Sequence, residues 1–335
     1  MSETSFQPSH ILLDPTVIDL PLTKKILSKF PLVPVQPLEH SKSHKQKSDF
    51  GLAKKKLVLS RMKADPIKEF GAMSRSSGRP YFSLDLISNC HLECTYCILH
   101  SYLENNPAIT LYVNLEEILD RLEAQIVQAV PGTVIGTGRI ADSMALEEIS
   151  EHNQALIPFF ANKQNVRLEL KTKSAKVDSL KNIFHQQRTV ISWSINPATI
   201  IQREEYKTAS FEERLQAAQK VAEWGYPIGF HFDPIIVHEG WKKNYAEALQ
   251  KIFKNLSAEN IAWMSIGTLR FPARQQKMMK KRFPKNTEIH QDLIASHRPL
   301  LHYPPALNED LFSWIELQIG RYLPKEKTYR CMDWA

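Results

Sequence analysis

The chain has 335 residues, of which 43% are hydrophobic and 24% charged, and it carries a formal net charge of +7. No run approaches about 18 apolar residues, and the first residues lack the charged and then apolar pattern of a signal peptide, so we expect a cytoplasmic protein without a membrane segment. Three of the four cysteines fall within eight residues, which argues against a disulfide framework and for a reducing compartment.

Residues 1–75 are predicted to form an N-terminal extension or small domain, in which prolines separate short apolar pieces. From Pro80 onward, apolar stretches typical of strands alternate with amphipathic stretches typical of helices. The six predicted strands cover residues 81–87, 133–137, 166–171, 189–195, 227–233 and 260–266. Strands separated by helices indicate a parallel sheet with right-handed crossovers. We therefore expect an α/β fold, a partial (β/α)6 barrel over residues 76–270, closed by a basic C-terminal segment over residues 271–335.

The first predicted strand leads into Cys90-His-Leu-Glu-Cys94-Thr-Tyr-Cys97. A loop at the end of a strand can wrap three thiolates around one metal centre, and iron–sulfur clusters are held by cysteine thiolates. With only three thiolates, a cubane cluster keeps one iron open for a substrate or cofactor. The alternative is a zinc knuckle, in which His91 or His100 completes the ligand set.

This cysteine motif resembles the signature of the radical S-adenosylmethionine (radical SAM) enzymes. The resemblance implies that Cys90, Cys94 and Cys97 bind a 4Fe-4S cluster. It also implies that SAM chelates the open iron and is cleaved reductively to a 5'-deoxyadenosyl radical. Tyr96 stands where this family places an aromatic ring beside the adenine. An electron donor such as a flavodoxin or ferredoxin is then an expected partner.

Two helices are well defined by their sequence pattern. Asn114, with Glu117 three residues later, predicts a capping box at the start of the helix that follows the cysteine motif. A second helix is predicted from Phe211 to Trp224, with Gly225 as its C-terminal stop.

The segments that follow the predicted strands carry the candidate ligand-binding residues, because chemistry in parallel barrels lies at the C-terminal ends of the strands. The second strand is followed by a loop whose glycines let a ligand approach the backbone. A lysine after the third strand can hold a carboxylate, and the fourth strand ends with a hydroxyl and an amide. For any one residue, ordinary capping or loop hydrogen bonding is the alternative. The candidates are Gly138, Asp142, Lys173, Ser194 and Asn196.

Several segments together resemble the spore photoproduct lyase family of radical SAM enzymes, whose founding activity reverts a UV-induced thymine dimer in spore DNA. The segments are Cys90–Cys97, Tyr112–Leu119, Ser194–Asn196, Gly225–Gly229, Pro234, His238–Trp241 and Arg270–Phe271. The resemblance covers most of residues 10–285. It implies a thymine-dimer-type DNA repair activity and SAM contacts from Asp142, Lys173, Ser194 and Asn196.

The chain departs from this family at the step that returns hydrogen to the product. In the lyase, a cysteine three residues before the aspartate of the second-strand loop donates a hydrogen atom, and Arg139 occupies that position here. The tyrosine that follows the third cluster cysteine is replaced by Ile98. Cys331 is the remaining thiol, in a C-terminal segment that could fold back across an incomplete barrel. Cys331, as hydrogen donor, and Arg139, as a fork for phosphate or carboxylate, are thus the candidate catalytic residues, and the alternative for Cys331 is an idle buried thiol.

Two basic tracts predict contact with a polyanion such as DNA. Seven basic residues and no acidic one lie between Arg270 and Lys285, and a second tract runs from Lys42 to Lys63. The alternative for both tracts is a solvated face. Three rival functions remain from the sequence: a radical SAM enzyme with a non-DNA substrate, a nucleic-acid-binding protein with a structural cluster, and the zinc knuckle.

Overall fold

The structure is a computed structural model, and it describes residues 3–38, 50–286, 289, 291–295 and 300–331. Its largest sheet has the strand order β18-β14-β13-β11-β10-β9-β5-β4. The six predicted strands form its centre, all parallel: β5 (Tyr81–Leu84), β9 (Thr133–Gly136), β10 (Val166–Thr172), β11 (Thr189–Ser194), β13 (Ile228–Ile235) and β14 (Ile261–Thr268). Two strands are added at the edges, namely β4 (Ile67–Glu69), antiparallel to β5, and β18 (Thr328–Arg330), parallel to β14.

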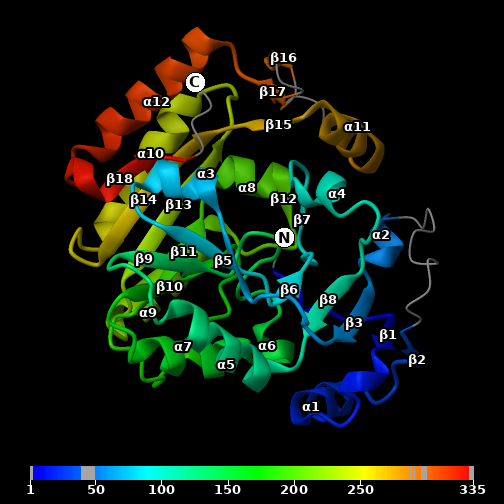
Figure 1. Ribbon diagram of the computed structural model, residues 1–335. Helices are drawn as coiled ribbons and strands as arrows, with labels where there is room; N and C mark the ends of the chain where they lie inside the picture. Colours follow the sequence, from blue (N-terminus) through cyan, green and yellow to red (C-terminus); the bar gives the residue numbers. More distant parts are fainter. Residues whose placement is uncertain (1–2, 39–49, 287–288, 290, 296–299, 332–335) are drawn as a thin grey trace.

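Helices cover the outer side of this curled sheet (Figure 1). They are α5 (Leu115–Ile126), α7 (His152–Ala161), α9 (Phe211–Glu223), α10 (Trp241–Asn255) and α12 (Pro305–Ile319). Two shorter helices lie elsewhere: α6 (Glu147–Ser150) packs against the N-terminal helix α1, and α8 (Ala198–Glu204) packs beside β12. The strands beneath the covering helices are almost continuously buried, as expected for parallel strands with both faces packed. The predicted partial barrel is therefore confirmed.

The two predicted helix starts have different outcomes. At α9, Ser210 and Glu213 form a complete capping box, in which the Ser210 hydroxyl accepts from the Glu213 backbone N–H (3.2 Å) and Glu213 accepts from the Ser210 N–H (2.7 Å). At α5, the capping box predicted for Asn114 is wrong. Its side chain instead pairs with the backbone of Met62, accepting from the N–H (2.8 Å) and donating to the carbonyl (3.2 Å). A tertiary contact has replaced the local cap.

The N-terminal extension shares a second sheet with the segment around the cysteine motif. Its strand order is β2-β1-β3-β8-β6. The members are β1 (His10–Leu13), β2 (Val35–Pro37), β3 (Lys56–Ser60), β6 (Ile87–Ser88) and β8 (Ile109–Tyr112), and the extension also contains α1 (Pro21–Lys29), α2 (Phe50–Ala53) and α3 (Gly71–Ser77). Because β6 and β8 precede and follow the cysteines, this sheet supports the cysteine loop from one side.

The C-terminal segment returns to the barrel. After β14 the chain forms β15 (Arg270–Pro272), α11 (Ala273–Arg282), β16 (Ile294–Ala295) and β17 (Leu300–His302) before α12 and β18. Strands β15, β17 and β16 form a small sheet of their own. Among the helices of the described chain, none has the length and hydropathy needed to cross a membrane.

Candidate active site

The three clustered cysteines lie on the loop between β6 and α4 (Leu99–Tyr102). Cys94 belongs to the two-residue strand β7 (Glu93–Cys94), which pairs antiparallel with β12 (Glu205–Tyr206). All three are free thiols, and each is close enough to another for their charges to interact. Burial raises the pKa of each thiol. One loop thus presents three unpaired sulfurs to the same part of the barrel mouth.

Three cysteine thiols on one loop match the donor set of an iron–sulfur cluster. In the described part of the chain, no three His, Cys, Asp or Glu side chains converge closely enough to hold one metal ion. A tetranuclear cluster holds its cysteine sulfurs further apart than one ion does. His91 Nε2 lies 3.1 Å from the Thr4 carbonyl oxygen and His100 packs between Phe50 and Phe283, whereas His91 Nδ1 and both ring nitrogens of His100 are buried without a hydrogen-bond partner among the described residues.

Three predicted SAM contacts converge on a carboxylate that the sequence did not single out. Glu205 is fully buried, and its Oε1 accepts from Lys173 Nζ (3.1 Å), from Asn196 Nδ2 (3.1 Å) and from the Tyr96 hydroxyl. Its Oε2 accepts from Arg214 (2.6 Å), which is also fully buried. Although burial opposes ionisation, Arg214 and Lys173 hold the pKa of the Glu205 carboxyl well below its usual range. Because Glu205 pairs in register with Cys94, this polar group adjoins the cysteine loop.

Two other predicted ligand-binding residues, Asp142 and Gly138, lie where the loops of the barrel mouth pack together. Asp142 accepts from the backbone N–H groups of Met144 (2.9 Å) and Lys173 (2.7 Å) and from the Thr172 hydroxyl (2.6 Å). It therefore ties the loop after β9 to the end of β10. Gly138 passes so close to β10 that an added Cβ would stand 2.8 Å from the Lys171 Cβ.

Ser194 and Arg139 are held by other parts of the chain. The carbonyl of Ser194 accepts from Arg214 Nη1 (2.9 Å), and its side chain is half-buried. Arg139 forms an ion pair with Asp85, which follows the first barrel strand. Its guanidinium fork is thus engaged by a carboxylate of the chain itself, and the loop after β9 is bound to the end of β5.

Cys331 stands in the barrel interior, directly after β18. Its backbone N–H donates to the Ile266 carbonyl (2.6 Å), and only 2% of the residue is exposed. The thiol contacts both members of the Asp233–Arg270 ion pair, whose closest N–O distance is 3.1 Å. Burial raises the pKa of the Cys331 thiol, so it stays protonated at neutral pH. The C-terminal segment returns to the edge of the barrel sheet, where β18 pairs with β14.

A second buried carboxylate, Glu169 on β10, lies deeper in the barrel and was also missed by the sequence. Its donors are Ser192 Oγ (2.7 Å), Trp263 Nε1 (3.0 Å) and the Tyr81 hydroxyl (2.5 Å), and His231 Nε2 lies at 2.9 Å. Two glycines make room for this group. A Cβ at Gly136 would stand 1.9 Å from the Tyr81 hydroxyl, and one at Gly229 would stand 2.2 Å from Ser192 Oγ.

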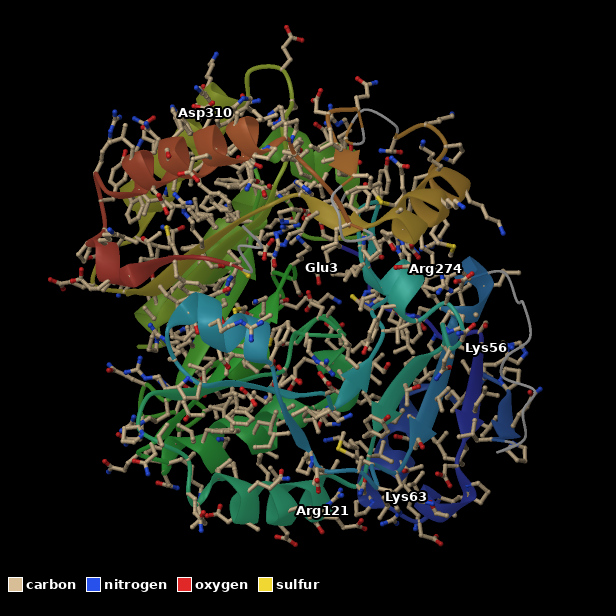
Figure 2. All side chains as sticks on the ribbon, turned by 45° about the horizontal axis from the view of Figure 1, so that its top comes forward. Glu3, Lys56, Lys63, Arg121, Arg274 and Asp310 are labelled. Carbon is tan, nitrogen blue, oxygen red and sulfur yellow. The ribbon has the colours of Figure 1, made fainter. Side chains whose placement is uncertain are left out.

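Residues 3–6, here called the N-terminal strap, cross the barrel mouth. Glu3 lies near the middle of the molecule in Figure 2, where its carboxylate accepts from the Ser174 hydroxyl and the Ala175 N–H (2.8 Å). The Thr4 carbonyl meets His91 of the cysteine loop. Lys176 Nζ donates to the Ser5 hydroxyl (2.6 Å). The strap therefore connects the cysteine loop to the segment after β10.

The predicted basic surface has fewer exposed, unpaired charges than the number of basic residues in the sequence tract suggests. Each of its three arginines pairs with a distant carboxylate: Arg270 with Asp233, Arg274 with Glu104, and Arg282 with Glu93. The exposed cations left on or beside α11 are Lys277, Lys280, Lys281 and Lys285, and among the described residues no carboxylate lies within 4.0 Å of their ammonium groups. In the second tract, residues 42, 45 and 47 lie outside the described residues, while Lys54 is buried.

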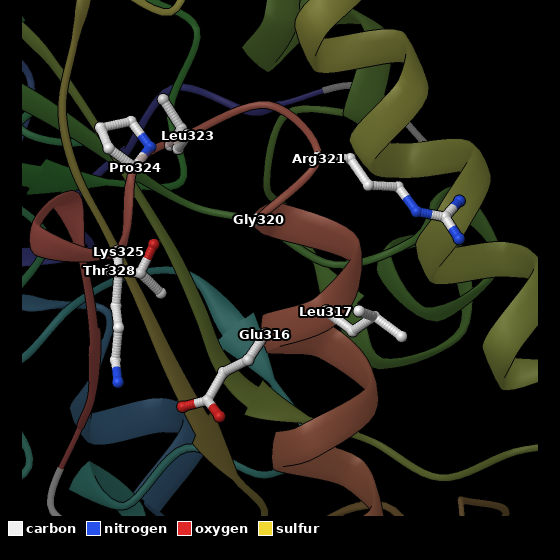
Figure 3. A pocket seen from close by; sticks show the side chains of 8 residues that line it. All are labelled: Glu316, Leu317, Gly320, Arg321, Leu323, Pro324, Lys325 and Thr328. Carbon is white, nitrogen blue, oxygen red and sulfur yellow. The ribbon is translucent and has the colours of Figure 1, made fainter.

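A separate hollow of about 490 Å³ lies beside the end of α12 (Figure 3). Residues of the last helical turn and the following loop line it, among them Glu316, Arg321 and Lys325. None of the predicted site residues lines this hollow, so it is separate from the cysteine loop.

Sequence comparisons relate the whole chain to one family. A family model described as "Spore photoproduct lyase" matches residues 6–296. The spore photoproduct lyase of Geobacillus sp. (strain Y412MC61) is 26% identical over 98% of this chain and 93% of its own length. The enzyme of the same name from Bacillus subtilis (strain 168) is 26% identical over 84% of each chain. That of Clostridium acetobutylicum is 30% identical over 63% of this chain and 62% of its own length.

Solved structures show the same architecture. A spore photoproduct lyase complexed with dinucleoside spore photoproduct has a TM-score of 0.82 at 24% identity, covering 98% of this chain and 99% of that one. A mutant of the lyase with bound AdoMet and dinucleoside spore photoproduct has a TM-score of 0.83 at 24% identity, covering 99% and 100%. At this level of identity, the likeness establishes the α/β fold with its curled half-barrel sheet.

Proposed function

The chain belongs to the spore photoproduct lyase family, and from this premise we propose that it is a radical SAM enzyme that acts on damaged DNA. The observation that carries the proposal is the convergence of Tyr96, Lys173 and Asn196 on Glu205, directly beside the cysteine loop. The family resemblance implied a place beside SAM for each of these three residues separately, in three different segments. Their meeting at one buried point supports a common ligand.

Cys90, Cys94 and Cys97 are the proposed ligands of a 4Fe-4S cluster. When bound and reduced in the presence of SAM, such a cluster supplies a 5'-deoxyadenosyl radical. The chain's own contribution is to hold the partners in place. Glu205 fixes the Lys173 ammonium and the Tyr96 hydroxyl, and Lys173 keeps 15% of its side chain exposed, so it can meet the SAM carboxylate.

DNA is the proposed substrate for two reasons. Two solved relatives carry a dinucleoside spore photoproduct, which is a piece of damaged DNA. The exposed lysines Lys277, Lys280, Lys281 and Lys285 also give this face a charge suited to phosphates. A non-DNA substrate is the second candidate, favoured by the family resemblance, which sets Arg139 where the lyase has its hydrogen donor.

Cys331 is the proposed hydrogen donor. Its protonated thiol lies inside the barrel between Asp233 and Arg270. A carbon-centred substrate radical would take the hydrogen atom from sulfur, forming a C–H bond and leaving a thiyl radical. One electron from a flavodoxin or ferredoxin and one proton would restore the thiol. Replacing Cys331 by Ala should leave SAM cleavage intact and divert the substrate radical to side products.

The test is anaerobic reconstitution of the protein with iron and sulfide, followed by reduction in the presence of SAM. We expect about four irons per chain, a brown colour and release of 5'-deoxyadenosine. Adding DNA that contains spore photoproduct should yield repaired thymines, while undamaged DNA is the control. A colourless protein with stoichiometric zinc would contradict the cluster, and SAM cleavage without any lesion repair would support the non-DNA candidate.

A further inference from the structure

Lys54 is a buried lysine that the N-terminal extension supplies to the cysteine loop. It directly follows α2, and only 4% of its side chain is exposed. Its Nζ donates to the Leu92 carbonyl oxygen (2.7 Å) and lies 3.4 Å from Glu93 Oε1. Leu92 and Glu93 stand between the first two cysteines of the motif. Lys54 therefore joins the extension to the middle of the Cys90–Cys94 turn.

The positive charge at this point exceeds the negative charge of the side chains around it. Glu93 Oε2 accepts from Arg282 (2.6 Å), and Lys207 Nζ lies 3.9 Å from Glu93 Oε1. One carboxylate thus faces three cations, and in the described chain it is the only carboxylate within 4.0 Å of Lys54 Nζ. A buried charge is costly unless it is paired. The arrangement calls for a further anionic neighbour.

The cysteine loop is where that negative charge would lie. Lys54 Nζ donates to the Leu92 carbonyl oxygen (2.7 Å), which lies within the Cys90–Cys94 turn. Lys173 Nζ lies 3.1 Å from Glu205 Oε1, and Glu205 pairs in register with Cys94. Two buried or partly buried ammonium groups therefore adjoin the cysteine loop.

We propose that Lys54 is a positioning residue for the iron–sulfur cluster: it holds the Cys90–Cys94 turn and favours the reduced state of the cluster through its charge. The inference rests on the proposed function. Three thiolates give the bound cluster a net negative charge, and reduction adds one more electron. Because a neighbouring cation stabilises the more anionic state, Lys54 raises the reduction potential and eases the electron transfer that precedes SAM cleavage.

The first test compares wild type with Lys54→Met, which removes the charge but keeps much of the side-chain volume. Both proteins are reconstituted anaerobically, iron is counted, and the midpoint potential is measured by an EPR-monitored redox titration. We expect unchanged iron content and at least a tenfold shift of the equilibrium against the reduced cluster, which for one electron is about 59 mV. Lys54→Arg should restore the potential. Lys56→Met is the matched control, because Lys56 is an exposed lysine on the outer side of the N-terminal sheet (Figure 2).

A second variant tests the sign of the effect. Glu93→Gln removes the carboxylate that offsets Lys54, so the potential should rise, opposite to the shift in Lys54→Met. If Lys54 and Glu93 only held the loop in place, the two variants would not shift the midpoint potential in opposite directions. If Lys54→Met is folded but assembles no cluster while Lys54→Arg does, the loop-holding role is supported.

Two outcomes would overturn the inference, and they can be told apart. A wild-type cluster whose potential is unchanged in Lys54→Met, or shifts alike in Lys54→Met and Glu93→Gln, removes the role of Lys54 and leaves the proposed function standing. Wild-type protein that binds no iron overturns the proposed function itself, and with it this inference.

Discussion

Two buried carboxylates organise the inside of the barrel, and their surroundings differ in kind. Glu205, on a short strand beside the cysteine loop, is held by the cations Lys173 and Arg214. Glu169, on a central strand, is held at contact distance by neutral groups of the sheet, such as Tyr81 and Trp263. The Glu205 group keeps a partly exposed ammonium for a ligand, whereas the Glu169 group is closed on itself. A buried charge therefore indicates a ligand-binding site only where one of the side chains that pair with it remains accessible to the ligand.

The largest loss of stability is expected when the hydrogen bonds to Glu169 are removed. Glu169→Leu leaves the Tyr81 hydroxyl, Ser192 hydroxyl and Trp263 indole N–H buried without an acceptor. We expect the free energy of unfolding to fall by about 3–5 kcal/mol, measured by urea denaturation. Glu169→Gln, which keeps one acceptor oxygen, is the matched control and should lose clearly less. Equal losses in the two variants would mean that the hydrogen bonds contribute little.

A third buried carboxylate, Glu147, is expected to make the free energy of unfolding depend on pH in the opposite sense to Glu205 and Glu169. Among the described residues, no lysine or arginine forms an ion pair with Glu147, and burial raises the pKa of its carboxyl to about 8. Because this carboxyl is protonated in the folded protein and ionised in the unfolded chain between about pH 4.5 and 8, its contribution to stability falls as pH rises through that window. Between pH 6 and 8 we expect a loss of roughly 2 kcal/mol that is absent in Glu147→Gln.

The other two carboxylates should show the opposite dependence. The pKa values of Glu205 and Glu169 are lowered in the folded protein. Their stabilising contribution is therefore complete above the usual glutamate pKa and is lost only on acidification below it. Urea titrations at several pH values separate the two behaviours. Identical profiles for wild type and Glu147→Gln between pH 6 and 8 would show that Glu147 is not strongly perturbed.

A smaller effect is expected at Glu205, whose partner Lys173 is partly exposed. It should appear in SAM binding and not in the free energy of unfolding. Lys173→Met leaves Glu205 paired with Arg214, so the free energy of unfolding should change by less than about 1 kcal/mol. SAM affinity should fall roughly tenfold, or about 1.4 kcal/mol, by isothermal titration of anaerobic protein. Lys181→Met, at an exposed lysine of the following loop, is the control. Unchanged SAM affinity would remove Lys173 from the ligand site.

The smallest effect on stability is expected at the surface, where charges are neither buried nor paired. Replacing Lys277, Lys280 and Lys281 by Gln should change the free energy of unfolding by less than about 0.5 kcal/mol. The slope of DNA affinity against salt should fall by roughly 0.9 for each phosphate that a replaced lysine no longer neutralises. The control replaces Lys242, Lys243 and Lys254 of α10, which are also exposed, although Lys242 pairs with Asp310 and Lys243 with Glu247. An unchanged slope would leave α11 as a solvated face.

The sequence predicted what depends on local pattern. The six barrel strands follow from apolar runs, and α9 follows from the apolar pattern that begins at Phe211 and from its stop at Gly225, because both signals are contained in a few neighbouring residues. The cysteine motif and Lys173 could be found for the same reason. The cap predicted at Asn114 failed because its side chain is taken by Met62, which lies far away along the chain.

Charge pairing accounts for most of what the sequence could not supply. Glu205 and Arg214 lie on different elements, and no spacing rule joins them. Arg282 and Lys54 looked like members of two basic tracts, yet both converge on Glu93. Ion pairs between segments far apart along the chain leave no trace in local composition, so the size of a basic surface is overestimated from sequence alone.

The N-terminal strap also sets an order of events during synthesis of the chain. Residues 3–6 are translated well before two of their partners, Ser174 and Lys176. The strap can therefore dock only after β10 has been completed, when the cysteine loop already exists. Until that moment the barrel mouth is not crossed by these residues, which leaves a period in which the proposed cluster can be assembled on the loop.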